Sequence, residues 1–168
     1  MNKTKLGKTG LEVTPLGLGL AEVWRHEAVG NVTDAEQVLN STLDRGINFL
    51  DTAPCYGSTE EIIGKTIAHR RSEYILATKC GHTVGGATEP PWTPAILEES
   101  IDRSLRRMRT DYIDLLQLHS CDVDVLEKGN VVEVLYKARD AGKTRFVGYS
   151  GDNEAAMWAI DSGLFDTI

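Results

Sequence analysis

The sequence lacks the features that mark several classes of protein. It has no excess of positive charge, because 18 Lys and Arg stand against 25 Asp and Glu and the formal net charge is -7. Such a chain is poorly suited to bind nucleic acid. No apolar run approaches the ~20 residues that a membrane span needs, and the opening stretch MNKTKLGKTG has no apolar core like that of a signal peptide. We therefore expect neither a nucleic-acid partner nor a membrane partner.

Cysteine is also scarce. The chain has 3 cysteines, an odd number, with no C-x-x-C pair and no spacing that matches a zinc site. This usage is typical of reduced thiols, so we expect a cytoplasmic protein that binds no metal. The remaining composition, 41% hydrophobic and 26% charged, is that of an ordinary globular chain. It gives no indication of oligomeric state.

Short apolar runs alternate with amphipathic segments along the chain, after a β-hairpin that we expect over Lys3–Val13. The expected strands are Leu16–Leu20, Ile47–Leu50, Tyr74–Thr78, Ile113–Leu118, Arg145–Tyr149 and the start of another at Phe165–Ile168. The expected helices are Thr33–Arg45, Ser58–Ala68, Pro94–Met108, Val131–Ala141 and Asn153–Asp161. Nearly continuous apolar strands such as IDLLQL, each followed by an amphipathic helix, predict an α/β fold with a buried parallel sheet.

Two architectures fit this alternation, a doubly wound sheet and a (β/α)8 TIM barrel. A dinucleotide-binding doubly wound sheet would carry G-x-G-x-x-G between its first strand and first helix, whereas LGLGLAEVW has no third glycine. The barrel is therefore favoured. A full barrel takes about 250 residues, and the chain has 168. We expect a single incomplete domain over residues 1–168, a barrel truncated after about five βα units.

Polar side chains follow the expected strands, at the end where barrels carry their active sites. Asp51, Lys79, His119 and Ser150 each come directly after a strand, and Tyr56 lies on the loop after Asp51. A free phenol with a pKa of ~10 is a poor proton donor at neutral pH, but a neighbouring ammonium makes a phenol more acidic. The set predicts that Tyr56 protonates a carbonyl oxygen, with Lys79 beside it and Asp51 holding Lys79 in place. His119 would orient that oxygen.

These motifs resemble the aldo-keto reductase family. The matching segments are KLGKTGLEVTPLGLG, GINFLDTAPCYG with EEIIG, ILATK, SLRRMRTDYIDLLQLH and FVGYS. The most specific are D-T-A-x-x-Y-G with the lysine, and D-Y-I-D-L-x-x-x-H. The resemblance implies a (β/α)8 barrel that uses NADP(H) or NAD(H), without a metal. Its reaction would be the reduction of a small-molecule aldehyde or ketone to an alcohol, or the reverse.

The resemblance also implies roles for individual residues. It makes Tyr56 the proton donor, with Asp51, Lys79 and His119 as its catalytic partners. The cofactor-binding positions that it implies are Gly19, Leu20, Asp51 and Ser150, with the serine contacting the nicotinamide carboxamide. The family usually has an asparagine after this serine, whereas Gly151 follows here.

Some alternatives stay open. The chain could be a regulatory or binding subunit that keeps the reductase fold, or a catalytically silent half-barrel. Trp24 and His26, on the loop after the first strand, are weaker candidates for substrate contacts, the alternative being ordinary loop packing. His82 has no evident partner, and Trp92 is expected to be a packing residue.

The cysteines also have two interpretations. Cys55, Cys80 and Cys121 adjoin Tyr56, Lys79 and His119 in the sequence and should therefore lie around the same mouth. They are either small packing residues or an oxidation-sensitive site, since a thiol beside an ammonium has a lowered pKa.

Overall fold

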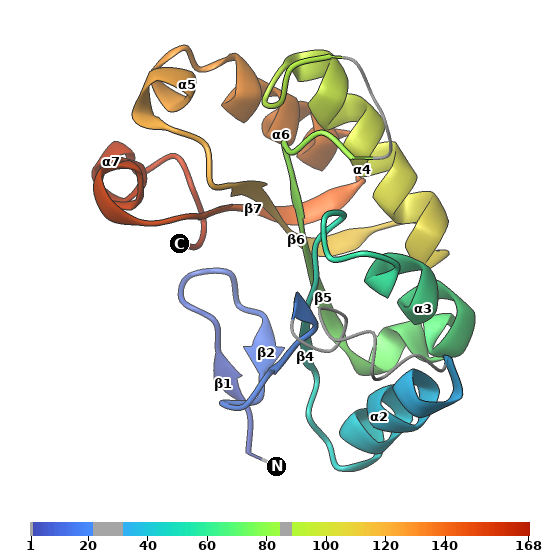
Figure 1. The fold of residues 1–168 in the computed structure, drawn as a ribbon. Helices are drawn as coiled ribbons and strands as arrows, with labels where there is room; N and C mark the ends of the chain where they lie inside the picture. Colours follow the sequence, from blue (N-terminus) through green and yellow to red (C-terminus); the bar gives the residue numbers. More distant parts are fainter. Residues whose placement is uncertain (1, 22–31, 85–88) are drawn as a thin grey trace.

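The structure is a computed structural model that describes residues 2–21, 32–84 and 89–168. Its centre is a sheet of five parallel strands whose order in space is their order in the chain (Figure 1). The strands are β3 (Leu18–Gly19), β4 (Phe49–Asp51), β5 (Ile75–Cys80), β6 (Ile113–His119) and β7 (Thr144–Ser150). All five were predicted, with ends that differ by no more than two residues.

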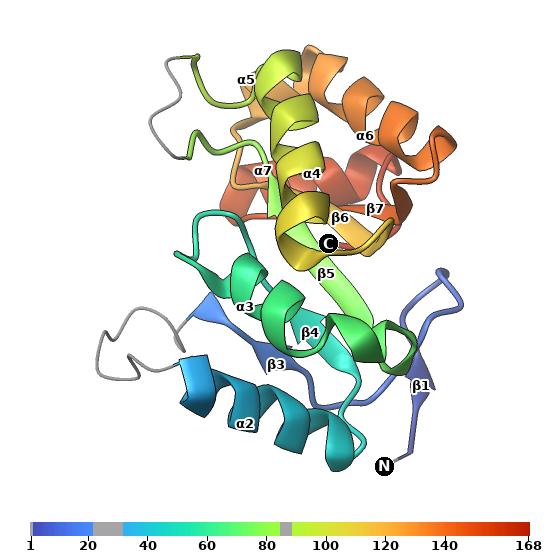
Figure 2. The ribbon, with the colours of Figure 1, turned by 90° about the vertical axis from the view of Figure 1, so that its right-hand side faces the viewer.

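A layer of helices covers the sheet. The helices are α2 (Val32–Asp44), α3 (Thr59–Thr66), α4 (Pro94–Met108), α6 (Asn130–Asp140) and α7 (Asn153–Ser162). Figure 2 shows α2, α3, α4 and α6 in chain order in front of the sheet, and each contacts the next. The sequence did not predict the short helices η2 (Ala68–Glu73) and α5 (Val123–Glu127). Within the described ranges, no helix has the length and apolar character needed to cross a lipid bilayer.

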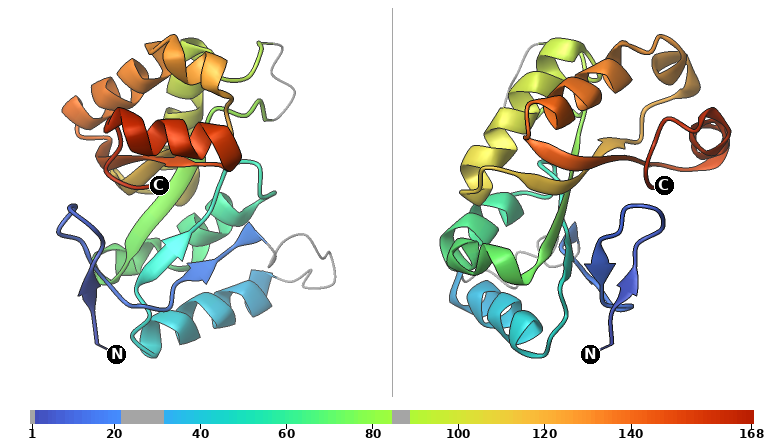
Figure 3. Two further views of the ribbon diagram at one scale, coloured as in Figure 1. Left: turned by 90° about the vertical axis from the view of Figure 1, so that its left-hand side faces the viewer. Right: turned by 180° about the vertical axis from the view of Figure 1, so that it is seen from behind.

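The order of the strands decides between the two architectures. A doubly wound sheet reverses its strand order at a switch point and carries helices on both faces. Here the order never reverses, and α2, α3, α4 and α6 lie on one face while the hairpin lies on the other side (Figure 1, Figure 3). This arrangement is that of a (β/α) barrel segment, as predicted.

The N-terminal hairpin pairs β1 (Thr4–Lys5) with β2 (Glu12–Val13) in antiparallel fashion. It is attached to the sheet through the buried Asn48, which immediately precedes β4. The Asn48 side chain accepts a hydrogen bond from the Thr14 amide and donates one to the Glu12 carbonyl, both at 2.8 Å. The hairpin therefore binds the amino end of β4 and leaves the carboxyl end of the sheet uncovered.

Of the strand expected to begin over Phe165–Ile168, the structure contains a single bridge to β7. Thr167 forms an isolated parallel bridge with Gly148 of β7. The Tyr149 amide donates to the Thr167 carbonyl at 3.1 Å. A further parallel pairing thus starts beside β7, in the next position of the barrel order.

Helices α3 and α4 touch at Gly64. This residue is buried in α3, and a Cβ there would collide with the main-chain carbonyl oxygen of Arg107 in α4. The contact explains why a residue of low helix propensity lies inside a helix. Because α3 follows directly on the loop that carries Tyr56, the same contact helps to position that loop.

We expect Gly64→Ala to destabilise the fold by about 1–3 kcal/mol, because an added methyl overpacks the helix crossing. The clash opposes the gain of about 1 kcal/mol that alanine brings to a helix interior. Urea unfolding measures the difference. Lys65→Ala, at the exposed neighbouring position, should change stability by no more than about 0.5 kcal/mol. A Gly64→Ala protein as stable as the parent would contradict the packing argument.

Candidate active site

Four of the predicted residues lie at one end of the sheet. Asp51, His119 and Ser150 are the last residues of β4, β6 and β7, and Lys79 is the last but one of β5. The parallel register pairs Asp51 with Ala77 and His119 with Ser150. The carboxyl ends of neighbouring strands are therefore aligned, which brings these side chains to a common edge.

Lys79 and Asp51 form an ion pair at this edge. The Lys79 Nζ lies 2.7 Å from Asp51 Oδ2 and also donates to the Thr52 carbonyl oxygen at 2.9 Å. The Lys79 side chain is 5% exposed and that of Asp51 33%. Gln117 Nε2 lies 3.5 Å from the second carboxylate oxygen of Asp51. Since a buried ammonium without a partner is costly, the carboxylate is what allows the lysine to occupy this place.

Tyr56 lies beside the ion pair. Its ring centroid is 4.9 Å from Lys79 Nζ and 6.0 Å from the His119 ring centroid, with the two ring planes at 87°. A tight turn presents the ring, because the Tyr56 amide donates to the Ala53 carbonyl at 3.0 Å. Gly57 follows with a φ of +61°, a backbone conformation that glycine adopts without strain. The D-T-A-x-x-Y-G motif is therefore a strand end followed by a turn that places the Tyr56 ring beside the Lys79 ammonium.

His119 is held through its main chain and through its ring. Its carbonyl oxygen accepts hydrogen bonds from His82 Nε2 and Trp92 Nε1, both at 3.0 Å. Its Nδ1 lies 3.6 Å from Cys55 Sγ. The pKa of His119 is lowered to about 4, first by burial and then by the electrostatic effects of His82 and Lys79. The imidazole is therefore neutral at pH 7, with a proton on one nitrogen only.

Sequence reasoning missed His82, Trp92 and Gln117. Trp92 packs against the core as expected. The hydrogen bonds that it and His82 donate to the His119 carbonyl were not predicted. The loop after β5 turns back so that the Trp92 amide donates to the Gly81 carbonyl at 2.7 Å, and a Cβ on Gly81 would collide with the Trp92 ring. These contacts could have been suspected from the position of the loop in the sequence, because it leaves the sheet at the end where barrel active sites lie.

The three cysteines differ in their surroundings. Cys55 is exposed, whereas Cys80 and Cys121 are buried in the hydrophobic core. Burial raises the pKa of the Cys121 thiol to about 12 and raises the pKa of the Cys80 thiol well above its usual range. Of the two interpretations, small packing residues fit Cys80 and Cys121, because both lie in the core and burial is the first cause of their raised pKa values. The interpretation as an oxidation-sensitive site with a lowered thiol pKa does not fit these two residues.

The predicted cofactor positions lie at the same end of the sheet. Gly19 pairs with Asp51, and no atom of the described residues outside its immediate chain neighbours lies within 4 Å of the place where its Cβ would stand. Leu20 is buried, and its amide donates to the Asp51 carbonyl at 2.9 Å. The half-buried Ser150 accepts a hydrogen bond at its carbonyl from the Ser120 amide at 2.8 Å. As far as the described residues go, the space over Gly19 is open, and the residue paired with Gly19 across the strands is Asp51.

Gly151, where the family usually has asparagine, has a packing reason. A Cβ at this position would collide with the ring of Tyr149. That ring is fixed, because the Tyr149 hydroxyl donates to the Cys121 carbonyl at 2.8 Å. The tyrosine therefore fills the space that a side chain at position 151 would need.

Two other predictions concern substrate contacts and metals. Trp24 and His26, the weaker substrate-contact candidates, lie outside the described residues. In the part of the chain that the structure describes, no group of three or more His, Cys, Asp or Glu side chains is arranged to hold a metal ion.

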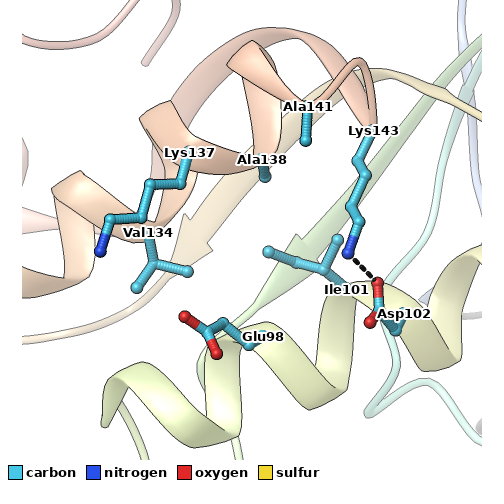
Figure 4. Close-up of a pocket in the computed structure, with 8 residues that line it drawn as sticks. All are labelled: Glu98, Ile101, Asp102, Val134, Lys137, Ala138, Ala141 and Lys143. Carbon is cyan, nitrogen blue, oxygen red and sulfur yellow. Dashed lines mark hydrogen bonds and ion pairs between the residues drawn. The ribbon is translucent and has the colours of Figure 1, made fainter.

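A separate pocket of about 240 Å³ lies between α4 and α6 (Figure 4). Its charged lining consists of Glu98, Asp102, Lys137 and Lys143, around an apolar floor. The Lys143 ammonium forms an ion pair with Asp102. The pocket belongs to the outer helix layer and contains none of the predicted catalytic residues, so we place the candidate active site at the strand ends instead.

Comparison with known proteins gives a consistent set of relatives. The model of the Aldo/keto reductase family matches residues 15–163. The chain is 35% identical over 153 residues to L-galactose dehydrogenase of Arabidopsis thaliana, covering 87% of this chain and 47% of that protein. It is 36% identical over 179 residues to 6-dehydroglucose reductase of Novosphingobium aromaticivorans, covering 98% and 56%.

A solved structure is similar over the same range. The holo form of an aldo-keto reductase from Bacillus halodurans matches with a TM-score of 0.82 at 32% identity, covering 94% of this chain and 53% of that chain. The chain thus spans about half the length of the relatives that it matches.

We expect the His119 imidazole to titrate near pH 4, well below the ~6.5 of an unperturbed histidine. Histidine-selective ¹⁵N NMR during an acid titration measures this midpoint. Lys79→Gln should move the midpoint upward, because a positive charge near the imidazolium is removed. An ordinary midpoint for His119 in the parent protein would contradict the burial argument.

The same shift has a consequence for stability. Between pH ~6.5 and the folded pKa, the unfolded state binds more protons than the folded state. The stabilisation that His119 contributes is therefore complete above pH ~6.5 and is lost as the pH falls toward 4. His119→Gln should flatten this part of the unfolding free energy plotted against pH, and an unchanged slope would contradict the linkage.

Proposed function

The chain belongs to the aldo/keto reductase family, and from this membership we propose that it forms part of an NAD(P)H-dependent oxidoreductase. The reaction is the reduction of a small aldehyde or ketone to an alcohol, or its reverse. The observation that carries this proposal is the cluster of Asp51, Lys79, Tyr56 and His119 at the carboxyl ends of adjacent strands.

In this proposal Tyr56 is the proton donor. Its hydroxyl gives its proton to the carbonyl oxygen of the substrate, and negative charge develops on the phenol oxygen. The Lys79 ammonium, 4.9 Å from the ring centroid, stabilises that charge. Asp51 keeps the ammonium charged and fixed through the 2.7 Å ion pair. General acid catalysis of this kind contributes ~10²–10⁴ in rate.

His119 orients the substrate in this scheme. A neutral imidazole can donate one hydrogen bond to the carbonyl oxygen without adding a second positive charge beside Lys79. The low pKa of His119, caused first by burial, supports this neutral role. The His119 ring stands perpendicular to the Tyr56 ring, which supports the proposal that both side chains hydrogen-bond the same carbonyl oxygen of the substrate.

The nicotinamide cofactor would be held by Gly19, Leu20, Asp51 and Ser150. When bound, it supplies the hydride that the carbonyl carbon receives. Gly19 leaves room for a flat ring, and Asp51, paired with Gly19 across the strands, borders that room. Ser150 is half-buried at the end of β7, where its hydroxyl could hydrogen-bond a carboxamide. These residues contribute to the nicotinamide end and leave the choice between NADPH and NADH open.

The alternative is a binding subunit that keeps the reductase fold without turnover. The ion-paired lysine favours the enzyme. A buried ion pair stabilises a fold no more than a well-packed apolar pair would, so a binding subunit would gain nothing from keeping this ammonium beside the Tyr56 ring. Turnover of a generic aldehyde with NADPH or NADH separates the two.

Tyr56→Phe should lower carbonyl reduction by at least about 10²-fold while cofactor binding, measured by quenching of protein fluorescence, is retained. The phenyl ring keeps the packing and removes only the transferable proton. Tyr112→Phe is the matched control, since Tyr112 packs against Arg71, away from the strand ends that carry Tyr56.

Two outcomes would count against the proposal. Retained turnover in Tyr56→Phe would exclude the tyrosine as the acid. Cofactor binding by the parent protein with no turnover of any aldehyde or ketone would favour the binding subunit.

A further inference from the structure

We propose that Cys55 is a positioning residue for His119, whose thiol donates a hydrogen bond to Nδ1 and so keeps the ring proton on Nε2. The catalytic consequence of this inference rests on the proposed reductase function. The hydrogen bond itself does not, and it can be tested without turnover.

The contact joins two elements that are distant in sequence. Cys55 lies on the turn just before Tyr56, and His119 ends β6, a separation of 64 residues. Cys55 Sγ is 3.6 Å from His119 Nδ1, within the range of a sulfur hydrogen bond. Among the described residues, this thiol hydrogen-bonds the His119 ring, whereas the bonds from His82 and Trp92 go to the main-chain oxygen.

The main chain of His119 is already fixed by those two bonds. His82 Nε2 and Trp92 Nε1 hold the same carbonyl oxygen from the loop after β5. What they leave undetermined is the rotation of the ring and the nitrogen that carries its proton. In a neutral histidine this tautomer is set by the hydrogen bond that the other nitrogen makes, and here the Cys55 thiol makes it.

The direction of the hydrogen bond follows from the strengths of the groups. A thiol is both a weak donor and a weak acceptor, whereas an unprotonated imidazole nitrogen is a good acceptor. An S–H to Nδ1 bond therefore uses the good acceptor. In the reverse bond, Nδ1–H would donate to the sulfur, which is a weak acceptor, and Nε2 would be unprotonated. With Nδ1 accepting, Nε2 carries the hydrogen and is able to donate to a carbonyl oxygen, as the proposed reaction requires.

Histidine-selective long-range ¹H–¹⁵N NMR at pH 7 tests the tautomer directly, with His119→Gln used to assign the signals. In the parent protein we expect a protonated Nε2 and an unprotonated, hydrogen-bonded Nδ1. Cys55→Ala should shift the Nδ1 resonance, because its donor is removed. Cys55→Ser should restore the parent position in part, since a hydroxyl can donate the same bond. Ser58→Ala, on the same loop without a side-chain cap bond, should leave His119 unchanged.

Kinetics test the positioning role. Cys55→Ala should lower kcat for carbonyl reduction by roughly two- to tenfold, the effect of one ordinary hydrogen bond, with cofactor affinity unchanged and Cys55→Ser intermediate. A protonated Nδ1 in the parent protein, or an Nδ1 resonance that Cys55→Ala does not move, would overturn the inference. So would unchanged kcat in Cys55→Ala when Tyr56→Phe abolishes turnover. If the parent protein has no turnover, the proposed function fails and the NMR outcomes alone decide the role of Cys55.

Discussion

The ion pair between Lys79 and Asp51 is the contact on which the rest of the site depends. A lysine that is 5% exposed would be expelled or neutralised without a carboxylate within bonding distance. The two residues come from adjacent strands, so the pair exists only if β4 and β5 keep their register, Leu50 opposite Leu76 and Asp51 opposite Ala77. A slip of one residue would turn every side chain of β5 to the other face. The geometry of the site therefore depends on the register of the sheet.

The two ends of the sheet satisfy their charges differently. Near the amino ends of the strands, the buried Asp114 accepts hydrogen bonds from Arg71 at 2.6 Å, Arg145 at 2.7 Å and the Leu76 amide at 2.9 Å. Both carboxylate oxygens of Asp114 thus accept hydrogen bonds, and the network stabilises the fold. At the carboxyl ends Asp51, Tyr56 and His119 are partly exposed, and the buried Lys79 ammonium lies among them. Barrels divide stability and chemistry between their ends in this way.

Much of the fold and of the candidate site could be predicted because apolar runs mark the strands and strand ends mark a barrel mouth. The path of the loop after β5 could not, since no periodicity constrains it, and His82 and Trp92 were missed for that reason. The contact from Cys55 to His119 spans 64 residues and depends on one turn geometry. The burial of Cys80 was open to prediction: side chains alternate along a strand, so with Lys79 facing the mouth, its neighbour had to face the core.

The same alternation connects the face of β5 that carries Lys79 to the helix layer. Thr78, on the side of the strand opposite to Lys79, donates to Glu60 at 2.9 Å. Glu60 lies in the first turn of α3, and the loop that presents Tyr56 leads directly into that helix. The inner face of β5 thus positions the Lys79 ammonium. Its outer face, through Thr78 and Glu60, anchors α3, the helix that follows the Tyr56 loop. The distance between Lys79 and Tyr56 is consequently set by contacts on both faces of β5, rather than by the loop alone.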